Sequence, residues 1–143
     1  MKKTVSILFI LSVFTMACNP TASRKPSDAI VSAFKKMHPT ATILKWNDEP
    51  PIWEAKYEQG SEHGAVSFND KAEVTETELV IPETQLPTLN SIPEYMKAHY
   101  PTEKMQRCEL ITKQDGTINY EIQITGKEIV FDRQGKYLSE EPD

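Results

Sequence analysis

Two stretches of the sequence share one pattern: SDAIVSAFKKMHPT at residues 27–40 and SIPEYMKAHYPT at residues 91–102. Each begins with a serine that can cap a helix and ends in a Pro-Thr pair that cannot continue one. Between these signals, three residues recur at i, i+4 and i+7, the spacing of one helix face: Ile30, Phe34 and Met37 in the first stretch, and Ile92, Met96 and His99 in the second. The constant offset of 62 residues predicts two helices that arose by duplication.

Strand-like segments follow both predicted helices. After a short apolar segment (43–46 and 105–108), residues 52–58 and 118–124 alternate between apolar and polar side chains, as a half-buried strand does. The pair Asp115-Gly116 before the second of these is a strong hairpin signal. A third strand in each half ends at Phe68 and at Phe131, where the turns NDKA (69–72) and DRQG (132–135) correspond. Fourth strands are predicted at 74–81 and 136–139.

The two halves predict one α+β domain. We expect tandem helix-plus-strands repeats at 27–81 and 91–143, joined by a linker at 82–90, with both helices packed on one face of a shared antiparallel sheet. A unit of about 50 residues is marginal alone, because it removes too little surface from water. The predicted core joins the helical residues Ile30, Phe34, Met37, Ile92 and Met96 to the strand residues Trp53, Tyr57, Phe68, Tyr120, Ile122, Ile124 and Phe131.

The N-terminal segment is typical of export. A basic start precedes an apolar run at 5–14, which is too short to span a bilayer but fits the core of a signal peptide. Residues 15–18, TMAC, resemble the lipobox of bacterial lipoproteins, although Thr15 stands where Leu is usual. By that resemblance 1–17 is a signal peptide, Cys18 is the lipidated residue, and 18–26 tether the domain to the outer membrane. The alternatives are cleavage by ordinary signal peptidase, giving a periplasmic or secreted protein, and a retained anchor.

Charge and composition exclude several function classes. The chain has 143 residues with 16 basic and 21 acidic side chains, a net charge of −5. Loss of Lys2 and Lys3 with the signal peptide leaves 14 basic residues and a net charge of −7. Such a surface does not favour nucleic acid, which binds basic faces. With Cys18 lipidated, Cys108 is the one remaining thiol, and we expect it to be buried and inert.

Several quoted motifs resemble a known family. The helix ends Met-His-Pro and His-Tyr-Pro, the strands WEAKY (53–57) and YEIQI (120–124), and the turn FDRQGKYL (131–138) are similar to PepSY-like, β-lactamase-inhibitor-protein-like (BLIP-like) domains. These domains are common in envelope lipoproteins of Bacteroidetes, and the resemblance covers residues 27–140. It implies a helix-on-sheet tandem and a binding or inhibitory role rather than catalysis. Inhibition of a β-lactamase would rest on analogy of fold alone.

Candidate site residues are few. No phosphate loop, nucleophile elbow or metal-ligand spacing occurs, so we predict no catalytic, cofactor-binding or metal-binding residue and no enzyme activity. Glu54, Glu58 and Glu121 are expected on solvated strand faces without shifted pKa values. Two residues are possible partner contacts: Glu62, at the tip of an expected loop from 60 to 64, and Trp46, an anchor if it lies on the open sheet face and a core residue otherwise.

The sequence thus predicts a non-enzymatic cell-envelope protein that binds another envelope protein, such as a hydrolase or protease that it restrains. It touches the membrane only through the lipid anchor. The alternative from another class is a small-ligand or envelope-stress sensing module without inhibitory activity.

Overall fold

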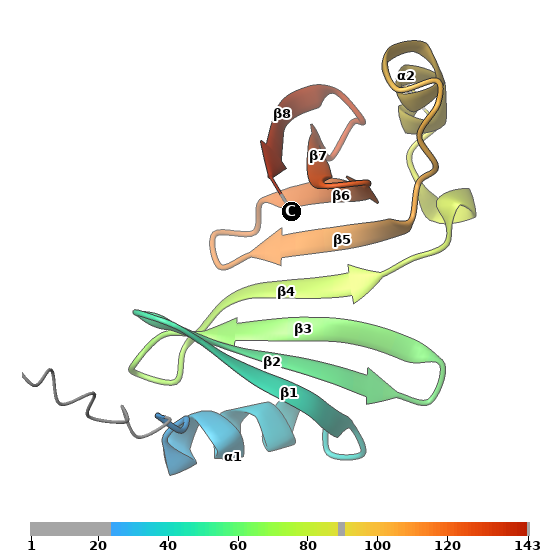
Figure 1. Cartoon of the computed structure of the whole chain (residues 1–143). Helices are drawn as coiled ribbons and strands as arrows, with labels where there is room; N and C mark the ends of the chain where they lie inside the picture. Colours follow the sequence, from blue (N-terminus) through green and yellow to red (C-terminus); the bar gives the residue numbers. More distant parts are fainter. Residues whose placement is uncertain (1–23, 89–90, 143) are drawn as a thin grey trace, which may run out of the picture.

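The computed structural model describes residues 24–88 and 91–142, which form an α+β fold with one antiparallel sheet (Figure 1). The expected α+β class with one shared antiparallel sheet is confirmed. The first half contains α1 (Asp28–Met37), β1 (Thr42–Glu49), β2 (Ile52–Gln59), β3 (Glu62–Phe68) and β4 (Val74–Val80). After the short 3₁₀ helix η1 (Glu83–Gln85), the second half contains α2 (Ile92–His99), β5 (Arg107–Lys113), β6 (Ile118–Ile124), β7 (Lys127–Asp132) and β8 (Tyr137–Pro142).

Both helices begin where the sequence places their caps. The Ser27 hydroxyl accepts a hydrogen bond from the backbone N–H of Ile30, and Ser91 accepts one from Glu94, each at 3.4 Å. These bonds satisfy amide groups that have no partner within the helix. The helices end at Met37 and His99, two residues before their prolines. Within the residues described, no helix is long and apolar enough to cross a membrane.

The sheet has eight strands in sequence order, β1 to β8, each antiparallel to the next. The Asp115-Gly116 signal is confirmed as the β5–β6 turn, where Gly116 has φ 84° and the Asp115 carboxylate accepts from the N–H of Thr117 at 2.8 Å. The halves join through β4 and β5, which pair from Glu76 with Lys113 to Val80 with Glu109.

The β3–β4 and β7–β8 turns have the same hydrogen bonds. Asn69 Oδ1 accepts from the N–H groups two and four residues later, at 2.9 and 3.0 Å. Asp132 Oδ1 does the same in the second turn, at 2.8 and 2.9 Å. The fourth turn residue is left-handed in both, with φ 61° at Ala72 and φ 82° at Gly135. The correspondence of 69–72 with 132–135 therefore holds in three dimensions.

Each helix has its own hydrophobic cluster on the sheet. Ile30 and Phe34 of α1 pack on side chains of β2 and β3, namely Trp53, Ala55, Tyr57, Val66 and Phe68. Ile92 and Met96 of α2 pack with Ile81, Leu86, Cys108, Ile122, Ile124, Ile129 and Phe131. The strand register places both sets of strand residues on the same face, so both helices cover one side of the sheet. Leu86 shows that the 82–90 segment contributes to the second cluster.

Two predicted packing residues are corrected. Met37 is 43% exposed, because the next residue, His38, fills the space beside the core. The His38 ring lies 4.3 Å from the Tyr57 ring and 5.3 Å from the Phe34 ring. His99 is also exposed and stacks on Tyr95, a neighbour on α2, with ring centroids 4.1 Å apart. The last helical turn thus contributes less to each core than its spacing predicts.

Candidate functional site

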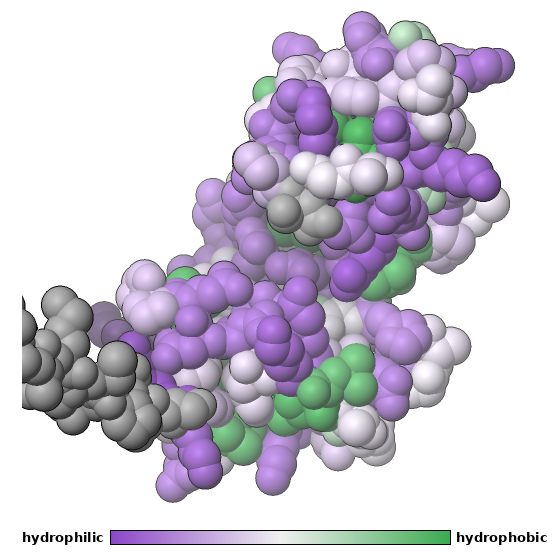
Figure 2. Space-filling view, viewed as in Figure 1, coloured by the Kyte–Doolittle hydropathy of each residue, from purple (hydrophilic) through white to green (hydrophobic). Residues whose placement is uncertain are grey.

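The face of the sheet opposite the helices is lined by charged side chains. We call it the open face; it comprises Lys45, Asn47 and Glu49 of β1, Ile52, Glu54, Lys56 and Glu58 of β2, His63, Ala65 and Ser67 of β3, Glu76, Glu78 and Val80 of β4, Arg107, Glu109, Ile111 and Lys113 of β5, Asn119, Glu121 and Gln123 of β6, Glu128 and Val130 of β7, and Ser139 and Glu141 of β8. These residues alternate with the core residues along each strand and therefore point away from α1 and α2. The face of the molecule shown in Figure 2 is mostly hydrophilic. Its largest hydrophobic patch lies where α1 and β1 meet.

The register brings carboxylates of neighbouring strands together. Glu109 of β5 lies directly opposite Glu121 of β6. Glu128 of β7 lies two pairs further along, opposite Gln123 and diagonal to Glu121. Like charges placed directly opposite destabilise an antiparallel pair, so this arrangement has a cost in stability that packing alone does not explain.

Cations offset part of this charge. Arg107 Nη2 lies 2.9 Å from Glu109 Oε1, and Lys113 Nζ lies 4.0 Å from Glu76 Oε2. Glu54 has two partners, since its Oε1 lies 3.3 Å from Lys56 Nζ and accepts a hydrogen bond from the Asn47 side chain at 3.2 Å. Glu109 and Glu54 are only 7% and 8% exposed. Their ion pairs compensate for the loss of water around these carboxylates.

Burial and mutual repulsion raise the pKa of several of these glutamates. Desolvation, together with Glu109 and two other carboxylates, raises the pKa of Glu78 to about 7. Desolvation, with Glu128 and Glu109, raises the pKa of Glu121 to about 8. Burial also raises the pKa of Glu76, against the lowering effect of Lys113. Part of the open face therefore carries protons near neutral pH.

The open face is hollowed in two places. One hollow of about 380 Å³ lies beside Glu54, Ser67, Glu76 and Glu78. The other, of about 200 Å³, is lined by Ile111, Asn119 and Glu121, with Glu76 at its edge as well. Two apolar side chains on this face, Ala65 and Ile111, are 2% and 5% exposed. The open face thus has buried apolar side chains that are surrounded by carboxylates.

The structure corrects the expectation of ordinary carboxylates on the second strands. Glu54 and Glu121 do point away from the core, but Glu54 is buried and the pKa of Glu121 is strongly raised. Sequence reasoning missed Glu76, Glu78 and Glu109. The signal was the alternation in VTETELV (74–80) and RCELITK (107–113), which became informative only once β4 and β5 were known to be neighbours.

The expected loop from 60 to 64 is a tight turn. Gly60 (φ 63°) and Ser61 connect β2 to β3, so Glu62 begins a strand, and Gly64 lies inside it. Glu62 is exposed, and its Oε1 accepts a hydrogen bond from the Tyr57 hydroxyl at 3.3 Å. Burial, followed by the charge of Glu62, raises the pKa of Tyr57 to about 12. Glu62 is therefore accessible, but it does not stand at the tip of a projecting loop.

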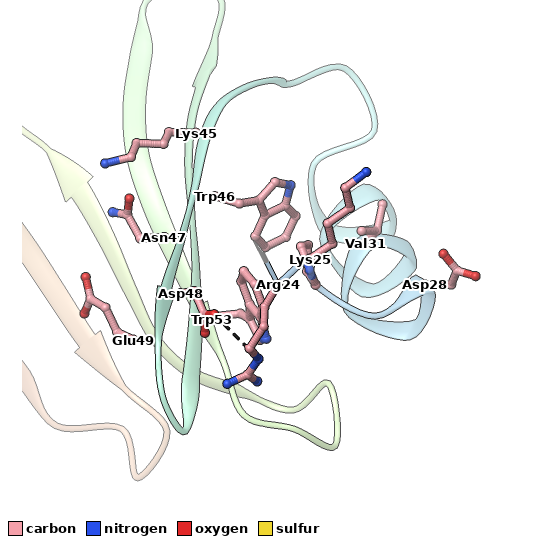
Figure 3. A pocket seen from close by; sticks show the side chains of 11 residues that line it. Arg24, Lys25, Asp28, Val31, Lys45, Trp46, Asn47, Asp48, Glu49 and Trp53 are labelled. Carbon is pink, nitrogen blue, oxygen red and sulfur yellow. Dashed lines mark ion pairs between the residues drawn. The ribbon is translucent and has the colours of Figure 1, made fainter. Parts of the chain in front are cut away.

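Trp46 lies on the helix side of the sheet, not on the open face. It is half-buried, opposite Ala55 of β2, and its ring makes an edge contact with Phe34 at 6.0 Å. It also lines a hollow of about 1080 Å³ between β1, the start of α1 and residues 24–26 (Figure 3). There Arg24 lies 3.6 Å from Asp48 and 5.7 Å from the Trp53 ring. The proposed lipidation residue, Cys18, lies outside the described residues.

Other chemistry has little support in the described part of the chain. Residues 24–88 and 91–142 contain no group of three or more His, Cys, Asp or Glu side chains arranged to hold a metal ion. Cys108 is a free, buried thiol, and burial, with Glu83 and Glu109, raises its pKa to about 11. A thiol of this kind is a weak nucleophile at neutral pH.

Comparisons with known proteins identify the fold. No protein-family model matches the sequence, and no curated protein matches it. Several solved structures, in contrast, match its fold. A BLIP-like protein from Bacteroides fragilis is 23% identical, with a TM-score of 0.64 over 85% of this chain and 89% of that one. A protein from Bacteroides eggerthii described as periplasmic is 18% identical, with a TM-score of 0.71 over 83% and 90%. A DUF2874 family protein from Bacteroides ovatus is 16% identical, with a TM-score of 0.68 over 83% and 89%.

These similarities confirm the coarser part of the resemblance: the chain has the fold of a BLIP-like protein. Sequence identities below 25% carry no residue roles from one protein to another, so they establish fold and not activity.

Proposed function

We propose that this protein is a non-enzymatic protein of the bacterial cell envelope that binds another envelope protein through the open face of its sheet. The observation that carries the proposal is the half-buried row of carboxylates, including Glu78 and Glu121, on a face that neither α1 nor α2 covers. Isolated glutamates on a surface are fully hydrated. These glutamates instead lie around two hollows, where repulsion between neighbouring strands lowers stability. Functional surfaces commonly show such perturbed groups.

By binding, the protein would restrain the activity of its partner. An eight-stranded sheet with polar hollows can cover the entrance of a hydrolase or protease without any chemistry of its own. The fold shared with a BLIP-like protein supports this role as an analogy. We expect no inhibition of β-lactamases themselves, because no contact motif of that inhibitor is found in this sequence.

The location proposed is the outer membrane, with Cys18 as the lipid anchor. Support comes from the export signal in residues 1–17 and from structural relatives described as periplasmic. Expression of the wild-type chain and Cys18→Ala, followed by detergent phase separation, tests this. The wild type should enter the detergent phase and the variant the aqueous phase. Equal partitioning of the two would contradict lipidation.

The tandem origin is part of the proposal. We infer that 27–81 and 91–143 are copies of one unit. The matched turns at Asn69 and Asp132 and the matched capping serines, Ser27 and Ser91, support this inference. In a duplicated unit the junction of the copies, β4 with β5, creates a face that neither copy has alone. Glu76, Glu78 and Glu109 lie at that junction.

Capture from an envelope extract of the source organism tests the function. The mature chain, Glu78→Lys and the control Glu103→Lys are immobilised, and the bound proteins are identified. Glu103 is exposed between α2 and β5, away from the open face. A partner held by the wild type and by Glu103→Lys but lost with Glu78→Lys supports the proposal, and the purified partner is then assayed for inhibition. Equal capture by all three contradicts binding through this face.

Two residues proposed from sequence receive their own variants in the same experiment. Glu62→Ala tests the exposed end of β3, and Trp46→Ala tests the hollow beside residues 24–26. That hollow is also the observation that favours the alternative, a small-ligand sensing module. A ligand bound there would raise the melting temperature of the wild type and not that of Trp46→Ala. If no protein is captured and such a shift is found, the sensing function replaces the binding function.

A further inference from the structure

The carboxylates of the open face are packed around one another more than around cations. Glu78 on β4 faces Glu109 of β5, Glu54 of β2 and Glu76 of its own strand, and Lys56 is the cation that acts on it. Water is partly excluded from Glu78, because this side chain is half-buried beside the hollow of about 380 Å³. In these surroundings the negative form of Glu78 is disfavoured by both desolvation and repulsion.

Glu121 on β6 repeats this situation two strands away. It faces Glu109 directly across the β5–β6 pair, forms a hydrogen bond with Glu128 of β7, and also senses Glu78. A hydrogen bond between two carboxyl side chains requires a proton on one of them. Glu141 of β8 lines the same hollow and adds to the negative charge. Burial and these neighbouring carboxylates therefore raise the pKa of Glu121, which keeps its proton to a higher pH than an exposed carboxyl group does.

Three cations on this face lie in ion pairs, and a fourth, Lys45 of β1, is exposed at the edge of the sheet opposite Lys56. Arg107 pairs with Glu109, Lys113 with Glu76, and Lys56 with Glu54. His63 of β3 also points to this side, at the exposed end opposite Glu58. Among the described residues, neither Glu78 nor Glu121 forms a salt bridge of 4 Å or less, because the nearby cations pair with other glutamates.

We propose that the open face is a docking surface for a protein segment rich in lysine and arginine, and that this surface exchanges its protons for the segment's cationic groups. The inference rests on the proposed function and names its partner chemistry and its control by pH. At mildly acidic pH the empty face holds protons on Glu78 and on Glu121. A lysine or arginine head group placed between these carboxylates removes the repulsion that kept them protonated, so binding releases protons to solvent.

Lysine and arginine side chains match the shape as well as the charge. Each has a methylene stem that packs on apolar surface and a charged head that reaches polar groups. The half-buried Ile52 and Val130 line the two hollows and provide apolar contact on this face, and the surrounding glutamates provide acceptors. A small inorganic cation would use the carboxylates alone, and the described residues do not group them as metal ligands.

The test uses the mature chain in a His63→Gln background, so that the imidazole does not contribute. The probe is a hexalysine peptide, whose side chains stay charged throughout the range. Its dissociation constant is measured by calorimetry at pH 6.0 and pH 8.5 at one ionic strength. We expect the dissociation constant to be lower at pH 8.5 than at pH 6.0 by about tenfold or more. Tenfold is the change that one pKa unit of coupling represents. In buffers of different ionisation enthalpy, the measured heat should show net proton release near pH 7.

Matched variants decide the outcome. Glu78→Gln/Glu121→Gln keeps the size of both side chains and should bind hexalysine with a dissociation constant that changes less than about threefold between the two pH values. Glu94→Gln/Glu103→Gln removes the same charge from exposed positions and should keep the full pH dependence. An equal pH dependence in all three proteins, or no proton release by the wild type, overturns the inference. The proposed function would fail separately, if Glu78→Lys still captured the envelope partner.

Discussion

Ala72 in the β3–β4 turn and Gly135 in the β7–β8 turn occupy the same left-handed position, with φ values of 61° and 82°. Glycine adopts this conformation without a steric penalty, whereas for alanine the penalty is about 1–2 kcal/mol. The first half therefore holds a strained alanine where the second half has the residue that the turn favours.

Exchange of the two residues should change stability in opposite directions. We predict that Ala72→Gly raises the free energy of unfolding by up to about 1 kcal/mol, since relief of strain exceeds the loss of a small partly buried methyl group. Gly135→Ala should lower it by at least about 1–2 kcal/mol, because Gly135 is also buried. Urea denaturation of both variants measures this. A destabilised Ala72→Gly would show that the Ala72 methyl group matters more than its backbone strain.

Gly64 is required by close packing within the sheet. A Cβ atom at this position would collide with the backbone carbonyl oxygen of Glu78 and lie 3.0 Å from the Tyr57 hydroxyl oxygen. Because a backbone atom cannot move aside cheaply, Gly64→Ala should destabilise the protein by about 1–3 kcal/mol. Gly126→Asn is the control, since Gly126 has open space around it and asparagine tolerates its φ of 70°. Similar melting temperatures for Gly64→Ala and the wild type would contradict the close approach.

The stability of the protein should fall as the pH rises from 6 to 9. In the folded state the pKa of Glu121 is raised to about 8 by burial, Glu128 and Glu109, so the folded chain binds a proton that the unfolded chain has already lost. Stability is thus greatest below the unfolded pKa and declines as the pH passes through 8. Glu121→Gln should flatten this decline and stabilise the protein by roughly 0.2–1 kcal/mol at pH 9.

Thermal unfolding of wild type, Glu121→Gln and the exposed control Glu103→Gln at several pH values measures this effect. The control should behave as the wild type does. A wild type that becomes more stable between pH 6 and 9 would show that Glu121 is ionised throughout.

The core of the first half depends on Phe34 and not on Met37. Phe34 is 1% exposed and contacts the rings of His38, Trp46 and Tyr57. We expect Phe34→Ala to cost about 3–5 kcal/mol, whereas Met37→Ala, at an exposed site, should stay within about 0.5 kcal/mol of the wild type. Chemical denaturation compares the two. A large effect at Met37 would return it to the core that its helical spacing predicts.

The Cys108 thiol should react slowly in the folded protein. It is 4% exposed, and burial, with Glu83 and Glu109, raises its pKa to about 11, so little thiolate exists at neutral pH. Labelling with a thiol-specific reagent at pH 8 should proceed far faster in 6 M guanidinium chloride than in buffer. Equal rates would mean that β5 opens readily at its start.

Local signals account for most of what the sequence determined. The capping serines and terminating prolines set both helices, and the Asp115-Gly116 pair set a hairpin, because each acts on the backbone within a few residues. Alternation at period two separated the faces of the strands.

Tertiary structure decided which of those side chains interact across strands. Whether Met37 or His38 fills the space beside Phe34 depends on where the Tyr57 ring lies, and Tyr57 is on another element. The pairing of β4 with β5 and of β5 with β6 brings Glu78, Glu109 and Glu121 together from positions up to 43 residues apart. Desolvation and repulsion depend on which groups are close in space. The alternation in the sequence therefore indicated which way these carboxylates point, but it did not indicate their raised pKa values.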